Sequence, residues 1–99
     1  MNRRTRLEQR MSDAVRNLAV GEVVSYADVA ARAGRPGASR AAGRLLAKSD
    51  SSLPWWRVVY SDGRLPQHNP ELHQQRLEQE GVVLKNGRVV SAPLGRFET

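Results

Sequence analysis

The sequence predicts a small, mostly helical α+β domain that contains a winged helix-turn-helix and a short β-hairpin. Two observations favour this class. In the first half of the chain, apolar residues recur every three or four positions, which is typical of amphipathic helices. In the second half, short runs rich in β-branched residues alternate with glycine-containing turns, which is typical of strands. The 99 residues are the length of one domain, so residues 1–99 are expected to fold as a single unit.

Amphipathic periodicity predicts the first helix, over residues 4–19. The residues of its expected core face are Leu7, Met11, Ala14, Val15 and Leu18. Gly21 ends this helix, and residues 22–24 follow as a short extended segment.

A helix-turn-helix is predicted at about residues 25–48. Ser25 is placed to cap the first of its helices, 26–33, because Asp28 follows three residues later as in a capping box. A Gly-Arg-Pro-Gly segment breaks that helix, and a second helix follows at about 37–48. Two short helices joined by a tight glycine turn are the outline of this motif.

Strand and helix signals alternate in the second half of the chain. Residues 55–60 are predicted to form a strand, since all but one of them are aromatic or β-branched. Asn69 is expected to cap a helix that begins at Pro70 and runs to about Glu80.

The last part of the chain carries a hairpin signal. An Asn-Gly pair at residues 86–87 is the usual two-residue hairpin turn, here between extended runs at 82–84 and 88–90. A hairpin that follows a helix-turn-helix resembles a wing. Residues 91–99 are expected to be a loosely held tail.

The charge of the chain favours a nucleic-acid partner. The formal net charge is +6, and 14 of the 16 basic residues are arginine, which suits phosphate recognition and stacking on rings. Residues 32–57 contain six basic residues and one acidic residue. This excess is typical of a nucleic-acid-binding surface, although a solvated basic face has the same composition. No run approaches the roughly 20 apolar residues of a membrane span, so no membrane association is expected.

Groups for catalysis or for binding a cofactor or metal are scarce. The chain has no cysteine, which excludes disulfides, thiolate metal sites and a cysteine nucleophile, and which fits a cytoplasmic protein. His68 and His73 are expected at the surface, because no motif pairs either with a nucleophile and their spacing does not suit a helical metal pair. No phosphate loop or dinucleotide fingerprint is present, so no cofactor is expected.

Binding groups are better represented. Pro54, Trp55, Trp56 and Arg57 are consecutive, and neighbouring strand side chains point to opposite faces. One ring can therefore fill the core while the other lines a pocket and stacks on a nucleobase, although one or both rings in the core is the simpler interpretation. Arg40 lies among small residues that allow close approach to a partner backbone. The composition is equally consistent with an ordinary solvated arginine.

Several segments resemble, in order and spacing, the DNA-binding domain of O6-alkylguanine-DNA alkyltransferases over about residues 8–84. These segments are Gly21-Glu22-Val23-Val24-Ser25-Tyr26, Gly34-Arg35-Pro36, Ser39-Arg40-Ala41-Ala42-Gly43, the signature at 54–59, and Glu80-Gly81. Active members carry Pro-Cys-His-Arg, in which the cysteine accepts the alkyl group. Here Trp55 stands at the cysteine position, which marks the alkyltransferase-like proteins, and Trp56 stands at the histidine position. Those proteins bind alkylated guanine in DNA without repairing it.

The resemblance implies a role for each matching residue. Arg40 matches an arginine that enters the duplex in place of the flipped base, and Tyr26 matches a tyrosine that pushes the adjacent phosphate. The family docks its helix-turn-helix in the minor groove, so the expected DNA-binding residues are Tyr26, Ala38, Ser39, Arg40, Ala41 and Gly43. The expected lesion pocket consists of Tyr26, Pro54, Trp55, Arg57 and His68. Trp56 is expected to be buried on the side opposite Trp55, and Glu80 to be structural.

The implied function is non-enzymatic recognition of O6-alkylguanine in duplex DNA by nucleotide flipping, carried out by a monomer without a cofactor. The family implies that the bound complex flags the lesion for nucleotide excision repair, so proteins of that pathway are expected partners. A winged-helix transcription regulator is one alternative, with Arg40 on a base edge in the major groove of a defined sequence. A divergent alkyltransferase with another acceptor is the other.

Overall fold

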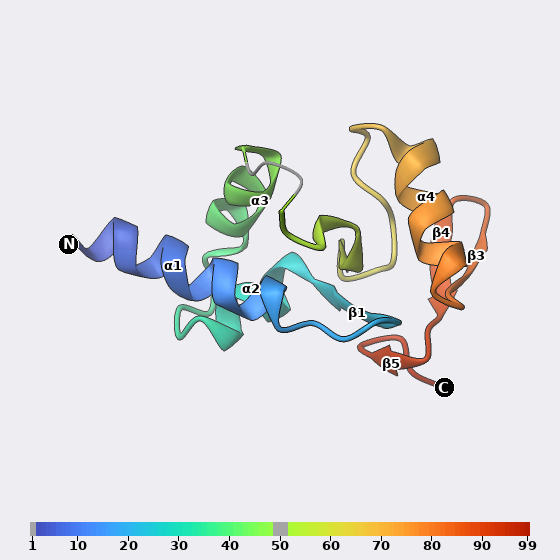
Figure 1. Cartoon of the computed structure of the whole chain (residues 1–99), viewed down its shortest axis with the longest axis horizontal. Coiled ribbons are helices and arrows are strands. Elements are labelled where there is room, and N and C mark those ends of the chain that lie inside the picture. The colour runs from blue at the N-terminus through green and yellow to red at the C-terminus, as the bar shows by residue number, and fades with distance from the viewer. Residues whose placement is uncertain (1, 49–51) are drawn as a thin grey trace.

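The computed structural model describes residues 2–48 and 52–99. The molecule is elongated, with extents of 41 × 25 × 20 Å. Helices α1, α2 and α3 lie at one end, and α4 with the β3–β4 hairpin lies at the other (Figure 1). In chain order, the first four elements are α1 (Arg3–Arg16), β1 (Glu22–Ser25), α2 (Tyr26–Arg32) and α3 (Ser39–Lys48). Those that follow are η1 (Trp55–Arg57), β2 (Val58–Val59), α4 (Pro70–Gln79), β3 (Val83–Lys85), β4 (Arg88–Ser91) and β5 (Leu94–Gly95).

The helix-turn-helix forms where the local signals place it. The backbone N–H of Asp28 donates to Ser25 Oγ at 3.0 Å and the N–H of Ser25 donates to Asp28 Oδ2 at 2.9 Å, so the predicted capping box is confirmed. The second helix begins at Ser39 rather than at residue 37, because Gly37 adopts a φ of +94° that does not belong to a helix.

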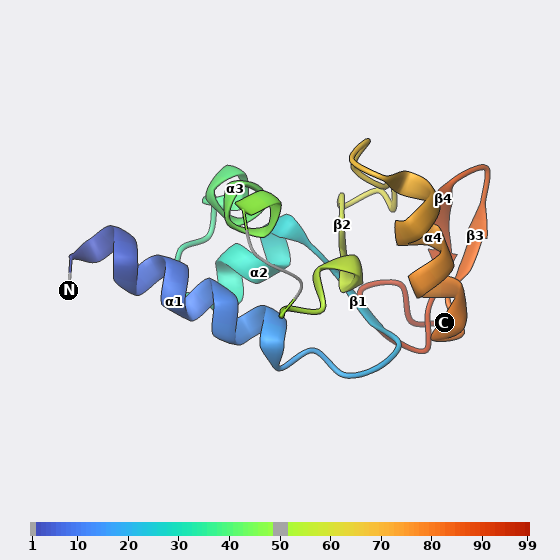
Figure 2. The same cartoon turned by 45° about the horizontal axis from the view of Figure 1, so that its top comes forward.

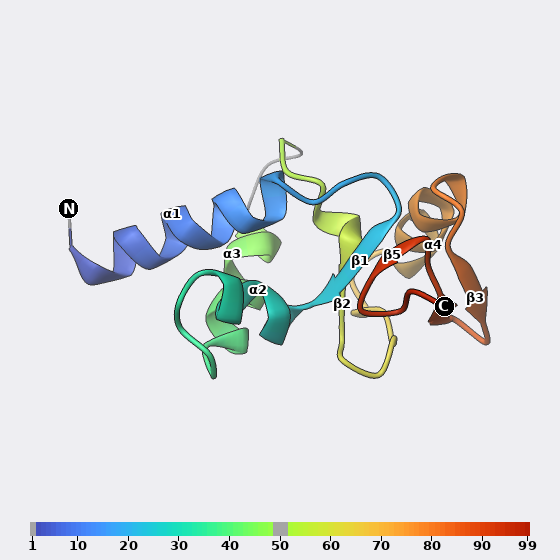
Figure 3. The same ribbon diagram turned by 90° about the horizontal axis from the view of Figure 1, so that it is seen from below.

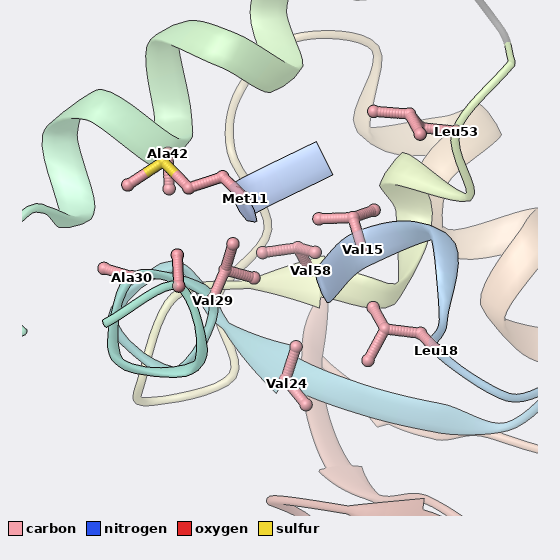
Figure 4. Packing of buried hydrophobic residues seen from close by; sticks show 10 residues of the cluster. Met11, Val15, Leu18, Val24, Val29, Ala30, Ala42, Leu53 and Val58 are labelled. Atoms are coloured by element: carbon pink, nitrogen blue, oxygen red, sulfur yellow. The ribbon is translucent and has the colours of Figure 1, made fainter. Parts of the chain in front are cut away.

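One hydrophobic core joins the three N-terminal helices. Side chains of α1, α2 and α3 meet there, together with Leu53 and Val58 from the segment around η1 (Figure 4). The helical residues at its centre are Met11, Val15, Val29, Ala30 and Ala42. Burial of this apolar surface is the main stabilisation of the helix-turn-helix.

Strand β1 lies at the centre of a three-stranded parallel sheet. Val24 and Ser25 pair with Val58 and Val59 of β2, and on its other edge β1 pairs with β5 (Figures 2 and 3). Because neighbouring strand residues point to opposite faces, Val24 and Val58 join the core of the helices. Val23 and Val59 join a second core with Leu77 of α4. The short sheet therefore connects the two ends of the molecule.

The predicted strand at residues 55–60 is only partly correct. Residues 55–57 form a turn of 3₁₀ helix, in which Arg57 N–H donates to Pro54 O at 3.1 Å, and only Val58–Val59 form a strand. Side chains in a 3₁₀ turn are about 120° apart, so strict alternation between two faces does not apply to the two tryptophans.

The expectation of a loosely held tail at residues 91–99 is wrong. Leu94 N–H donates to Gly21 O at 3.1 Å and Arg96 N–H donates to Val23 O at 2.9 Å, so the segment completes the sheet along the free edge of β1. Arg96 also forms an ion pair with Asp28 at 3.2 Å. An unpaired edge on a buried strand leaves backbone N–H and C=O groups without partners, which costs free energy. Pairing with β5 removes this cost for β1.

The C-terminal hairpin has the predicted turn. Asn86 and Gly87 have φ values of +54° and +74°, as a type I′ turn requires, and Lys85 pairs with Arg88 across it. The hairpin packs against α4 through β3. Pro70 is the first residue of α4 as predicted, but Asn69 does not cap it with its side chain, because it adopts a left-handed conformation. No helix in the described part of the chain is long and apolar enough to cross a membrane.

Candidate nucleic-acid interface

An open cavity of about 680 Å³ lies between α3, η1 and the loop that leads into α4. Five of the residues selected from the sequence line it: Tyr26, Arg40, Gly43, Trp55 and His68. They come from four segments that are far apart in the sequence. The lining also includes Arg44 and Tyr60, and it contains no acidic residue within the described part of the chain.

Helix α3 presents a cationic surface beside this cavity. Arg40 is exposed in the first turn of α3, and its side chain makes no hydrogen bond or ion pair with the other described residues. Its neighbours Ala38, Ser39 and Ala41 are half-buried and do not line the cavity. An arginine that projects without a partner from a helix of small residues is free to contact a ligand that approaches the helix.

Tyr26 lies at the start of α2, where the capping box fixes the backbone. Its ring contacts the ring of Tyr60 with centroids 5.5 Å apart and planes at 53°. Burial, together with the nearby Tyr60, raises the pKa of Tyr26 to about 12. The hydroxyl of Tyr26 is therefore protonated at neutral pH and can donate a hydrogen bond to a phosphate oxygen.

Trp55 is held at the cavity by two aromatic contacts. Its ring meets Trp56 edge-on, with centroids 5.9 Å apart, and meets the ring of His73 at 5.1 Å. His73 is buried, with 1% of its surface exposed, so the expectation that it lies at the surface is wrong. Its Nε2 lies 2.8 Å from Trp56 O, and the carbonyl must accept, so Nε2 carries a proton.

The buried histidine is neutral. Burial lowers the pKa of His73, and the hydrogen bond to Trp56 offsets only part of that effect. Its Nδ1 is buried and has no hydrogen-bond partner among the described residues. A proton on Nδ1 would have no acceptor, which explains why the neutral ring is favoured. His68, by contrast, is exposed as expected.

Glu80 connects η1 to the sheet. Its carboxylate accepts from Trp56 Nε1 at 2.7 Å, from Gly21 N at 2.7 Å and from Arg57 at 2.9 Å. Arg57 in turn donates to Leu18 O at 2.9 Å. Burial alone raises the pKa of Glu80, but the hydrogen bonds from these donors and the charge of Arg57 lower it overall.

This network assigns different places to the four residues of the 54–57 segment. Trp55 lines the cavity. Trp56 is half-buried rather than fully buried, and its indole N–H donates a hydrogen bond to Glu80. Arg57 and Pro54 do not line the cavity, contrary to the expected pocket. Arg57 holds Glu80 instead, and Pro54 precedes the 3₁₀ turn that orients Trp55.

Tyr60 and Arg44 are two of the lining residues that the sequence had not placed in the site. Tyr60 follows β2 directly. An aromatic residue immediately after two valines was the sequence signal that could have identified it. Arg44 lies four residues after Arg40 and thus on the same face of α3. No group of three or more metal-ligating side chains occurs among the described residues.

The sequence and the fold match a known class of DNA-binding domain. Residues 6–82 match the family described as 6-O-methylguanine DNA methyltransferase, DNA binding domain, and the chain belongs to that family. The DNA base-flipping protein of Escherichia coli (strain K12) is 38% identical over 88 residues, which cover 85% of this chain and 68% of that protein.

Solved structures confirm the fold class. S. pombe Atl1 in complex with damaged DNA containing O6-carboxymethylguanine is similar with a TM-score of 0.77 and 26% identity, over 86% of this chain and 83% of Atl1. Mycobacterium tuberculosis OGT in complex with DNA is similar with a TM-score of 0.67 and 30% identity, over 74% of this chain and 48% of OGT. The resemblance to alkyltransferase-like proteins is thereby confirmed.

Proposed function

We propose that this protein recognises O6-alkylguanine in duplex DNA by rotating the damaged nucleotide out of the helix, and that it leaves the lesion chemically unchanged. The observation that carries the proposal is the meeting of Tyr26, Arg40 and Trp55 around one open cavity beside α3. Residues 1–99 act in this recognition as a single DNA-binding domain and as a monomer.

The first step of recognition is binding of α3 in the minor groove. Small side chains at Ala38, Ser39, Ala41 and Gly43 allow the helix to approach the backbone closely. Arg40 then fills the gap that the flipped nucleotide leaves in the base stack, where its planar guanidinium replaces part of the lost stacking. Tyr26 pushes the adjacent phosphate and keeps the nucleotide rotated. Flipping costs a few kcal/mol, and less for a damaged base that pairs weakly.

The second step is capture of the alkylated base in the cavity. Trp55 offers an apolar ring, held by His73 and Trp56, against which the base or its alkyl group packs. An indole has no lone pair able to attack an alkyl group, and the chain contains no cysteine. The site therefore supports binding without alkyl transfer.

The biological consequence belongs to the same proposal. A complex that holds a lesion without repairing it is useful only if another machinery acts on it, so nucleotide excision repair proteins are the proposed partners. The expected cytoplasmic location remains a prediction.

Competition binding tests this function. A fluorescently labelled duplex with one O6-methylguanine is displaced either by the same unlabelled duplex or by its unmodified counterpart. Contact of one methyl group with an apolar pocket corresponds to roughly 10- to 200-fold discrimination. Affinity should fall with salt for both duplexes, because phosphate contacts release counterions. Equal affinity for the two duplexes at every salt concentration would refute lesion recognition.

Intact-protein mass measurement tests the absence of chemistry. After incubation with the methylated duplex, the mass of the protein should be unchanged. A stable gain of one methyl group would show that this chain is a transferase.

A further inference from the structure

Tyr60 is an aromatic residue that stays exposed after the chain folds. The chain has five aromatic residues, and Tyr60 is 44% exposed and lines the same cavity as Trp55. Val58 and Val59, which precede it, are fully buried. An aromatic side chain that is not needed to fill a core, and that faces a cavity, is available to a ligand.

The turn that carries Tyr60 is held in place on both sides. Tyr60 N–H donates to Arg64 O at 3.0 Å and Gly63 N–H donates to Tyr60 O at 2.8 Å, which closes the turn. Gly63 has a φ of +89°, and a Cβ there would lie 2.4 Å from Val89 O, so the turn packs tightly on the hairpin. Tyr60 therefore sits on a fixed backbone, although its ring is exposed.

The ring itself is also fixed. Tyr26 contacts it with a centroid separation of 5.5 Å, and the guanidinium of Arg64 lies 5.5 Å from its centroid. Arg64 is oriented in turn by Asp62, at 2.8 Å. A ring that is oriented before binding loses little conformational freedom when a ligand stacks on it, which favours affinity.

We infer that Tyr60 is a specificity-determining residue of the lesion cavity, which contacts the flipped alkylguanine as a second aromatic surface beside Trp55. This inference rests on the proposed function. Because its neighbour Tyr26 is assigned to the phosphate, Tyr60 is the ring beside it in the cavity lining that stays available to the base or its alkyl group. Stacking of a base on an aromatic side chain contributes measurably to binding, and only a base that has been flipped into the cavity can make this contact with Tyr60.

The test compares Tyr60→Ala with Tyr60→Phe, which keeps the ring and removes the hydroxyl. Affinities are measured for duplexes carrying guanine, O6-methylguanine or O6-benzylguanine at one position. Tyr60→Ala should weaken binding to the damaged duplexes by roughly 5- to 150-fold, the range of one lost stacking contact, and most for the benzyl adduct. Binding to the undamaged duplex should not change, and Tyr60→Phe should bind all three duplexes like the wild type.

The alternative role of Tyr60 is support of Tyr26, and the two adducts separate these roles. Lost support would weaken binding to both damaged duplexes by the same factor and would overturn the inference, whereas a lost contact with the lesion weakens binding to the benzyl adduct most. If Tyr60→Ala weakens binding to damaged and undamaged duplexes by the same factor, or leaves both unchanged, the inference is overturned. A wild-type protein that discriminates while Tyr60→Ala discriminates equally well overturns the inference alone. A wild-type protein that does not discriminate overturns the proposed function and this inference with it. Thermal unfolding of both variants should show an intact fold, as expected for a residue that is 44% exposed.

Discussion

Replacement of Glu80 by glutamine should destabilise the protein strongly. The Glu80 carboxylate accepts from three residues on two segments: Gly21 before β1, and Trp56 and Arg57 of η1. A glutamine side chain has one acceptor oxygen and one NH₂ group, so at least one of these donors would face another donor. Arg57 would also lose the charge that pairs with its guanidinium, at 2.9 Å.

The magnitude follows from the burial of the pair. The side chains of Arg57 and Glu80 are 12% and 10% exposed, so the pair is largely desolvated. Removal of one partner from a buried pair costs about 3–5 kcal/mol, and this pair should lie near 3 kcal/mol because some exposure remains. In a domain of this length each 1 kcal/mol lowers the midpoint of thermal unfolding by about 4–8 °C, so Glu80→Gln should lower it by about 12–24 °C.

Urea and thermal unfolding followed by circular dichroism measure this effect. Glu78→Gln is the matched control, because Glu78 lies in the same helix with an exposed side chain, and its substitution should change the stability by less than about 0.5 kcal/mol. A Glu80→Gln variant as stable as the control would refute the structural role of the carboxylate. In that case, the hydrogen bonds from Trp56 and Arg57 to Glu80 would contribute little to the stability of η1.

Three further predictions concern the site. Arg40→Ala should weaken binding to the O6-methylguanine duplex by roughly 5- to 150-fold, whereas Arg6→Ala, an exposed change on α1, should have little effect; equal losses would make Arg40 an ordinary surface charge. Trp55→Ala should reduce the ratio of damaged to undamaged affinity while the far-ultraviolet circular dichroism stays unchanged, and an unfolded variant would assign Trp55 to the core. The free energy of unfolding should decline as the pH falls below about 6.5. In that pH range His73 binds a proton in the unfolded state but stays neutral in the folded state, where its pKa is lowered. The decline should level off below the folded pKa and should be smaller in His73→Gln; an identical pH dependence in that variant would show that His73 does not cause it.

The helix-turn-helix was predictable because its signals are local. Ser25 and Asp28 cap α2 by contacts within four residues, and Asn86-Gly87 selects its turn by backbone conformation alone. Such features depend only on residues that are neighbours in the sequence, so the sequence pattern predicts them.

The errors concern contacts between distant segments. Residues 91–99 pair with β1, which lies about seventy positions earlier, and nothing in their composition marks them as a strand. His73 is buried because Trp56 O and the Trp55 ring meet it, so its environment is tertiary. Its position four residues before the buried Leu77, on one face of α4, was the available signal.

The candidate site was predictable in its members more than in its geometry. The family resemblance supplied Tyr26, Arg40 and Trp55, which line one cavity. It did not show that Arg57 turns away from the cavity to hold Glu80, or that Tyr60 enters it. The place of Arg57 depends on the 3₁₀ turn at residues 55–57, which follows Pro54 and is hydrogen-bonded to Glu80 through Trp56. The place of Tyr60 depends on the turn that its hydrogen bonds with Arg64 and Gly63 close.

A crystal structure of the protein bound to a duplex with one O6-methylguanine would decide whether the lesion is recognised by flipping. The damaged nucleotide should be rotated out of the helix, with its base in the cavity against Trp55. Helix α3 should lie in the minor groove, with the guanidinium of Arg40 in the gap in the base stack. A lesion that stays stacked in the duplex while the cavity is empty, or α3 seated in the major groove, would contradict recognition by flipping.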